Sequence, residues 1–239
     1  MDIPSFPECN HTLVESLFEC SDHELLQRLQ EEPDAGRYFT ALFCRYSPVV
    51  YTLIRHSARS TVQSEYLFAL TWRHILSEVS SLKLPDDNPE EFSLQAWLVN
   101  LTAACINQAT LPEVEEIHYS LHQAPPPLWC YVTRALDRLP PLERLVLVMA
   151  QTFRWSSTRI AAYLQAEGQR MAPEQVDRQV ATASQSLMTA LPRDIQTIYF
   201  GQAQTAESED MLGDLLDMSD IDTESADIPA DISVDSSTR

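Results

Sequence analysis

The residues best suited by type and spacing to do chemistry are polar side chains between Pro173 and Leu191. Pro173 suits the first turn of a helix, where its missing amide hydrogen is not needed. Apolar residues then recur at helical spacing, at Val176, Val180, Ala183 and Leu187. The polar face of that helix carries amide, guanidinium and hydroxyl groups, which hydrogen-bond base edges in a DNA groove: Gln175, Arg178, Gln179 and Thr182.

Two further helices are predicted to position this face. The first begins at Pro140 and Pro141 and has an apolar stripe of Leu142, Leu145, Val146, Val148 and Met149. The second is capped by Ser156 or Ser157, buries Ile160, Ala161 and Leu164, and ends at Gly168 as a left-handed cap. Two short helices joined by a glycine-containing turn are typical of a helix-turn-helix, although three helices that merely pack together would give the same periodicity.

No arrangement of residues predicts catalysis, and we expect no catalytic residues, no metal and no cofactor. His118 and His122 are four residues apart, but no further ligands complete a zinc site. The five Cys residues have no C-x-x-C pair and are predicted to be buried, reduced thiols of a cytosolic protein. Four Gly residues leave no phosphate-binding loop.

The charge of the chain is strongly acidic. The net charge of −19 repels bare nucleic acid and suits a basic partner surface. The segment 201–239 holds much of this charge and is predicted to be a disordered acidic tail. The tail contains one short group of apolar residues, namely Met211, Leu212, Leu215, Leu216 and Met218. This group is predicted to fold as a helix on a partner or on the basic face of this protein. The alternative is that the whole segment is only a solubilising tail.

The N-terminal half is predicted to be a set of helices. Ser21 and Glu24 form a capping box before Leu25, Leu26 and Leu29. Further helices follow with Tyr38 to Tyr46, interrupted by Pro48, then over about 63–79 and 94–106, with an acidic loop at 85–89 between the last two. No signal peptide or membrane-spanning stretch is recognisable, so we expect a cytoplasmic protein that has no contact with a membrane.

Two parts of the sequence resemble the sigma-70 family of RNA polymerase sigma factors, in particular its extracytoplasmic-function type. The run Leu136 to Leu147, followed by Ile160-Ala161-Ala162-Tyr163-Leu164, is similar to region 4 of that family. Four runs are similar to region 2: Asp22 to Leu26, Phe39 to Tyr51, Trp72 to Ile75, and Phe92 to Leu98.

The resemblance implies an all-α protein that is not an enzyme. Its expected divisions are an N-terminal extension (1–20), a region 2-like domain (21–110), a linker with a stiff polyproline end (111–127), a region 4-like domain (128–200) and the tail (201–239). Family members bind core RNA polymerase through the β′ coiled coil and the β flap, and anti-sigma factors are possible regulators. The residues at the matching positions are Gln63, Glu65, Leu67 and Trp72 for the polymerase, with Asn100 and Asn107 facing the −10 promoter element.

The sequence departs from the family in its basic residues. No Lys or Arg lies between Lys83 and Arg134, and the predicted recognition helix offers only Arg178. Phosphate contacts dominate affinity for DNA, so we expect promoter binding only within the polymerase holoenzyme. Asn100 and Asn107 either bind bases or form a solvated face. The alternative function is a sigma-derived interaction protein that no longer reads promoters.

Overall fold

The computed structural model describes residues 4–58, 60–82 and 92–201, and every regular element in these ranges is helical, which confirms the predicted all-α fold. The predicted acidic loop at 85–89 and the tail from residue 202 lie outside the described residues. Among the helices described, none combines the length and apolar character needed to cross a membrane. In chain order the elements are η1 (Pro7–Asn10), α1 (Thr12–Glu15), α2 (Asp22–Glu31), α3 (Gly36–Ser57), α4 (Thr61–Val79), α5 (Leu94–Gln108), η3 (Val114–Glu116), α6 (Pro126–Arg138), α7 (Pro141–Gln151), α8 (Ser157–Ala166), α9 (Pro173–Ala190) and α10 (Arg193–Phe200).

The described residues fall into two compact units, which divide between Cys130 and Tyr131 inside α6. The first unit therefore includes all of residues 111–127, which the sequence assigns to a linker. The prediction of a stiff polyproline end to that linker is wrong. Pro126 and Pro127 instead form the first turn of α6, where a helix does not need their missing amide hydrogens.

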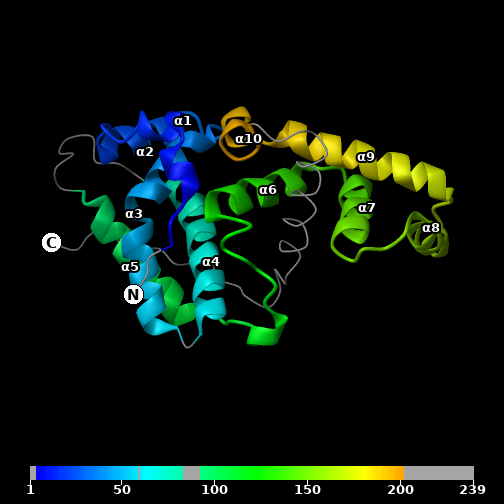
Figure 1. Cartoon of the computed structure of the whole chain (residues 1–239), viewed down its shortest axis with the longest axis horizontal. Coiled ribbons are helices and arrows are strands. Elements are labelled where there is room, and N and C mark those ends of the chain that lie inside the picture. Colours follow the sequence, from blue (N-terminus) through cyan, green and yellow to red (C-terminus); the bar gives the residue numbers. More distant parts are fainter. Residues whose placement is uncertain (1–3, 59, 83–91, 202–239) are drawn as a thin grey trace. The chain divides into compact units, whose positions relative to one another are not determined.

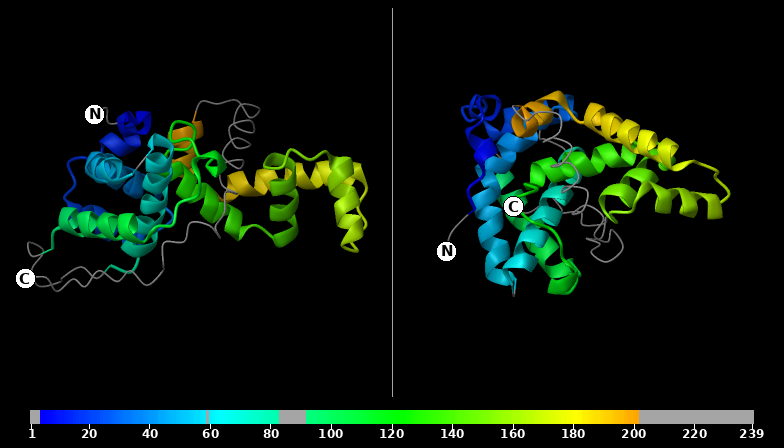
Figure 2. Two further views of the ribbon diagram at one scale, coloured as in Figure 1. Left: turned by 90° about the horizontal axis from the view of Figure 1, so that it is seen from below. Right: turned by 45° about the vertical axis from the view of Figure 1, so that its right-hand side comes forward.

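The core of the first unit lies between α3, α4 and α5, which run side by side (Figures 1 and 2). Its centre is Trp72, which is fully buried and lies with ring centroids 5.0 Å from Phe43 and 5.8 Å from Phe39. Phe68 packs 6.2 Å from the same indole. Edge-to-face contacts of this kind stabilise beyond the area that they bury.

Helix α3 runs without a break through Pro48, so the predicted interruption is wrong. A proline inside a helix removes one backbone hydrogen bond and costs about 3 kcal/mol. Buried side chains on both sides of it, including Tyr46, Val50 and Ile54, offset that cost because the continuous helix packs all of them into one core. Tertiary packing therefore overrides the local signal.

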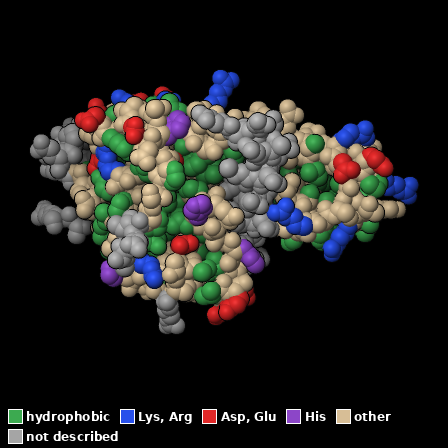
Figure 3. Space-filling view, in the orientation of Figure 1, with side chains coloured by type: hydrophobic (Ala, Val, Ile, Leu, Met, Phe, Trp, Pro, Cys, Tyr) green, Lys and Arg blue, Asp and Glu red, His purple; other side chains and the backbone are tan. Residues whose placement is uncertain are grey.

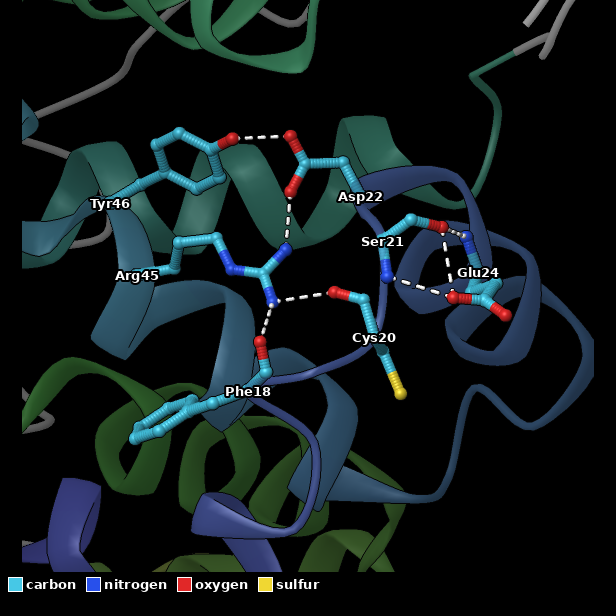
Figure 4. A network of polar contacts seen from close by, with 7 residues as sticks. All are labelled: Phe18, Cys20, Ser21, Asp22, Glu24, Arg45 and Tyr46. Atoms are coloured by element: carbon cyan, nitrogen blue, oxygen red, sulfur yellow. Dashed lines mark hydrogen bonds and ion pairs between the residues drawn. The ribbon is translucent and has the colours of Figure 1, made fainter.

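The start of α2 has the predicted capping box. Ser21 Oγ accepts a hydrogen bond from the Glu24 amide at 3.2 Å, and the Glu24 carboxylate accepts one from the Ser21 amide at 2.8 Å. The bond from the Ser21 amide, together with one that the Ser21 hydroxyl donates to the same carboxylate at 2.9 Å, lowers the pKa of Glu24. Figure 4 shows the adjoining network, in which Asp22 pairs with Arg45 and accepts a hydrogen bond from the Tyr46 hydroxyl. This network ties the start of α2 to α3.

The segment before α2 is fastened to α3 by a disulfide that the sequence reading missed. Cys9 in η1 is bonded to Cys44 in α3, so the expectation that all five thiols are reduced is wrong for this pair. Cys20 is half-buried and Cys105 and Cys130 are buried, and none of these three is part of a disulfide. Phe6, three residues before Cys9, packs with its ring centroid 4.7 Å from that of Phe43, the residue before Cys44.

Candidate functional site

The second unit contains the three helices over which a helix-turn-helix is predicted. Helices α7 and α8 both pack against α9 (Figures 1 and 2). Trp155, Met171 and Val180 pack at the margin of the shared core, which consists of Val146, Met149, Ile160, Ala161, Leu164 and Val176. The three residues predicted to face inward from α8 are all in this core. Helix periodicity in the sequence is therefore sufficient to orient α8.

The turn between α8 and α9 spans residues 167–172. Gly168 has a φ of 84°, the left-handed conformation expected of a helix cap, and the next amide, of Gln169, donates to the Leu164 carbonyl at 2.8 Å. At the other end of the turn, Gln175 Oε1 accepts a hydrogen bond from the Ala172 amide at 2.8 Å. Gln175 thus has a structural role at the start of α9 that the sequence reading did not include.

The outer face of α9 places the four predicted DNA-binding residues together. Gln175, Arg178 and Thr182 are exposed, and Gln179 is half-buried. The Thr182 hydroxyl donates to the Arg178 carbonyl at 2.8 Å, which leaves its oxygen free to accept. Towards the C-terminal end of the helix the same face continues as a shallow, open depression lined by Thr182, Gln185, Ser186, Thr189 and Ala190.

The electrostatics of the second unit differ from those of the rest of the chain. Residues 131–201 hold eight Arg and six acidic residues, whereas residues 1–130 hold seven basic and eighteen acidic ones. Figure 3 shows basic side chains spread over the part of the surface where α7 to α9 lie. On α9 itself, however, Arg178 is flanked by exposed Glu174 and Asp177, so the predicted reading face has little net charge.

Asn100 and Asn107 lie on α5 in the first unit, and both are exposed. They are seven residues apart, which places them on one face of a helix, about 10 Å apart along its axis. The opposite face is buried and contains Trp97, Leu98 and Leu101. The two Asn side chains are therefore accessible, but α5 has no Lys or Arg to neutralise phosphates beside them.

The four residues predicted to contact polymerase lie on α4, and they divide into two pairs. Leu67 is 3% exposed and Trp72 is 0% exposed, so both belong to the core and cannot touch a partner while the unit is folded. Gln63 and Glu65 are half-buried. Only this second pair is near the surface of the unit.

Gln63 and Glu65 are partly covered by residues 111–125, which we call the covering segment. Gln63 Nε2 donates to the Pro112 carbonyl at 3.2 Å, and the Leu121 amide donates a hydrogen bond to the Glu65 carboxylate. Burial raises the pKa of Glu65, while the bond from Leu121 and the nearby Arg55 act in the opposite direction. The net effect is a carboxyl group that protonates more readily than usual.

Tyr119 is the anchor of the covering segment. Its ring is 5% exposed and lies with centroids 5.6 Å from Trp129 and 6.2 Å from Tyr66 of α4. Its hydroxyl donates to the Ala124 carbonyl at 2.6 Å. Ile117 and Leu121 are buried as well, whereas Glu113, Glu115 and Glu116 face solvent. The covering segment therefore has an apolar inner side and an acidic outer side.

A comparison with protein-family models, with curated proteins and with solved structures finds no match to this chain.

Proposed function

We propose that this chain is a sigma-factor-like subunit of transcription initiation, which binds core RNA polymerase and directs it to promoters. The observation that carries the proposal is the helix-turn-helix of α8 and α9, whose outer face presents Gln175, Arg178 and Thr182 at exposed positions. Amide, guanidinium and hydroxyl groups on such a helix are the ones that read base edges in the major groove. The chain has no catalytic role in this proposal.

The charge of α9 supports reading of DNA only within the polymerase complex. Arg178 is opposed by Glu174 and Asp177, so the helix releases few counterions when it approaches phosphates. The isolated protein should then bind DNA weakly. A polymerase that holds the second unit at the −35 element raises its effective concentration at the groove and makes up for that weakness.

The polymerase surfaces in this proposal are on both units. Gln63 and Glu65 of α4 would contact the β′ coiled coil. The buried side chains of Leu67 and Trp72 would pack α4 against the core and so position these two residues. The second unit would meet the β flap. Because Gln63 and Glu65 bond to the covering segment, polymerase has to displace that segment to reach them. An anti-sigma factor or another regulator would act on the same surfaces.

The second candidate function is a sigma-derived interaction protein or adaptor that binds polymerase or a regulator without reading promoters. Two observations favour it. Helix α5 carries no basic residue beside Asn100 and Asn107, and α9 carries only Arg178. Loss of phosphate contacts on this scale removes orders of magnitude of DNA affinity, but it leaves a helical surface for proteins intact.

A pull-down of core RNA polymerase by the full chain, followed by promoter-directed transcription with the recovered complex, tests both functions. Polymerase binding together with specific transcription supports the first proposal. Polymerase binding without transcription, and with no salt-dependent affinity for promoter DNA, supports the adaptor. Absence of polymerase binding contradicts the sigma-factor-like function and leaves, of the two, only an adaptor that binds a regulator.

A further inference from the structure

An exposed group of aromatic and basic side chains lies at the start of α8, apart from the polar face of α9. We call Phe153, Trp155, Arg159 and Tyr163 the aromatic–arginine cluster. The ring centroid of Trp155 lies 5.8 Å from that of Phe153 and 5.8 Å from that of Tyr163. The guanidinium carbon of Arg159 lies 4.1 Å from the centroid of the Trp155 ring. Arg159 and Tyr163 are one helical turn apart and so share a face of α8.

The cluster faces solvent rather than the core. Phe153 is 56% exposed and Tyr163 is 40% exposed, although most large apolar side chains among the described residues are buried. The core face of α8 consists of Ile160, Ala161 and Leu164, on its other side. Tryptophan, tyrosine and arginine are also the residues that dominate the binding energy of protein interfaces. The composition and exposure together indicate a surface that binds a peptide or protein.

The backbone holds the cluster in place before any partner arrives. The amides of Phe153 and Trp155 donate to carbonyls of α7 at 3.3 Å and 3.0 Å, and Trp155 also packs against the helix-turn-helix core. Between them, Arg154 has a φ of 50°, a left-handed conformation that costs a non-glycine residue roughly 1–2 kcal/mol. A preorganised surface of this kind loses little conformational entropy on binding.

The chemistry of the cluster specifies an acidic partner with apolar side chains. Rings of Phe153, Trp155 and Tyr163 offer apolar contact area, and Arg159 beside them offers a cation. The cluster also lies within residues 131–201, which hold more basic than acidic residues, eight Arg against six Asp and Glu. Carboxylates that approach it are attracted by the whole unit.

We propose that the aromatic–arginine cluster is the docking surface for residues 207–220 of this same chain. That stretch reads ESEDMLGDLLDMSD and interleaves acidic residues with an apolar set at near-helical spacing, namely Met211, Leu212, Leu215, Leu216 and Met218. Methionine side chains make favourable contacts with aromatic rings. The segment itself lies outside the described residues, so the match is one of charge and side-chain type. It does not depend on a role in transcription.

The length of chain available allows this docking within one molecule. Helix α10 is held at the C-terminal end of α9, where Gln196 Nε2 donates to the carbonyls of Met188 and Leu191 at 2.7 Å and 2.9 Å. Helix α8 joins the other end of α9 through residues 167–172. The 18 residues of α9 span about 27 Å. The eleven residues that follow Phe200, up to Met211, reach up to roughly 36 Å, which exceeds that length.

Photo-cross-linking in the full chain tests the proposal. A benzophenone amino acid replaces Phe153 or Tyr163 in separate preparations, and the cross-linked peptides are identified by mass spectrometry. We expect both positions to cross-link to residues 207–220 of the same molecule. Replacing the five apolar tail residues by Ser should lower the yield at least threefold, and so should Arg159→Glu.

Phe18 provides the matched control, because it is an exposed aromatic residue of the first unit, at 44% exposure. The same photoreactive amino acid at position 18 should not cross-link to residues 207–220. Equal yields from positions 18 and 163, or yields unaffected by the Ser substitutions, would overturn the proposal. A mixture of isotopically light and heavy protein distinguishes docking within one molecule from docking onto a second copy. Cross-links between light and heavy copies would show that the tail binds a second molecule, which would overturn docking within one chain.

Loss of the contact is also measurable in the protein without any photoreactive group. Trp72, Trp97 and Trp129 are each less than 10% exposed, whereas Trp155 is half-buried at the surface. Acrylamide quenching of tryptophan fluorescence therefore reports mainly on Trp155, and the Trp155→Phe variant supplies the background. We expect the quenching constant to rise about twofold when the five apolar tail residues are replaced by Ser. An unchanged constant would count against docking on Trp155.

Discussion

The side-chain amide of Gln63 on α4 donates a hydrogen bond to the backbone carbonyl of Pro112, with 3.2 Å between nitrogen and oxygen. These residues are 49 positions apart in the sequence, and the bond fastens the covering segment onto the surface proposed to meet polymerase. A residue predicted to contact a partner is thus engaged inside its own unit. The covering segment therefore contributes to the fold of the first unit and also covers residues that are proposed to bind polymerase.

The first prediction concerns the anchor of the covering segment. Tyr119→Phe removes the hydroxyl that donates to the Ala124 carbonyl and keeps the ring, so the free energy of unfolding should fall by about 1 kcal/mol in urea titrations. Hydrogen exchange of the Leu121 amide, which bonds to Glu65, should become faster. Tyr163→Phe on the exposed surface is the control and should change neither quantity. Unaltered exchange at Leu121 would show that Tyr119 does not hold the segment.

A second prediction follows from the raised pKa of Glu65. Burial raises this pKa above its usual 4.5, so the folded protein takes up a proton more readily than the unfolded chain. The contribution of Glu65 to stability should therefore decrease as pH rises from about 4.5 through the folded pKa, and then stay constant. Glu65→Gln keeps an acceptor for the Leu121 amide and should remove this part of the pH dependence. Parallel stability–pH curves for the two proteins, from urea unfolding between pH 4.5 and 7, would contradict it.

The disulfide provides a third prediction. Cys9 and Cys44 are 35 residues apart, and closing a loop of that length stabilises a fold by about 2–4 kcal/mol. Cys9→Ser and Cys44→Ser should each lower the melting temperature, and a reducing agent should lower that of the original chain but not of either variant. Cys20→Ser is the control, because Cys20 is a free thiol. A melting temperature that does not respond to reductant would indicate that the bond contributes nothing.

Arg178 is the subject of a fourth prediction, which belongs to the proposed function. Arg178→Ala removes the only basic side chain on α9 and should lower promoter-directed transcription by about tenfold, the value of one good base contact. Arg193→Ala, at an exposed position of α10, should have a much smaller effect. Binding of polymerase should be the same for both variants. Equal transcription by the two variants would remove Arg178 from the reading face.

A fifth prediction tests the turn of the helix-turn-helix. Gly168 has a φ of 84°, and a methyl group added there would meet no atom within 4 Å, so the cost of Gly168→Ala is one of backbone conformation alone. We expect a loss of about 1 kcal/mol in the unfolding of the second unit. Gly168→Asn should cost less, because asparagine tolerates the left-handed region better. Equal losses for the two variants would point to a cause other than φ.

Short-range features of this protein follow directly from the sequence. Ser21 and Glu24 cap α2 as predicted, and Gly168 takes the left-handed conformation at the end of α8. Ile160, Ala161 and Leu164 face the core because helical periodicity assigns them to one side. Three of the four residues on the predicted face of α9, Gln175, Arg178 and Thr182, are exposed for the same reason. Each of these depends on residues within a turn or two of one another.

Other features depend on residues that are far apart in the sequence, and only the tertiary structure decides them. Pro48 has a strong local signal for a break, yet the packing of α3 in an aromatic core keeps the helix continuous. Leu67 and Trp72 are apolar residues on a predicted helix, but the sequence pattern does not show that the core encloses them. The pairing of Cys9 with Cys44 and the bond from Gln63 to Pro112 join distant segments, and no local pattern encodes such contacts. Hydrogen bonds and side-chain spacing within one helix determine where that helix forms and which side is apolar. Burial depends on how all segments pack together, and it determines which surfaces remain accessible.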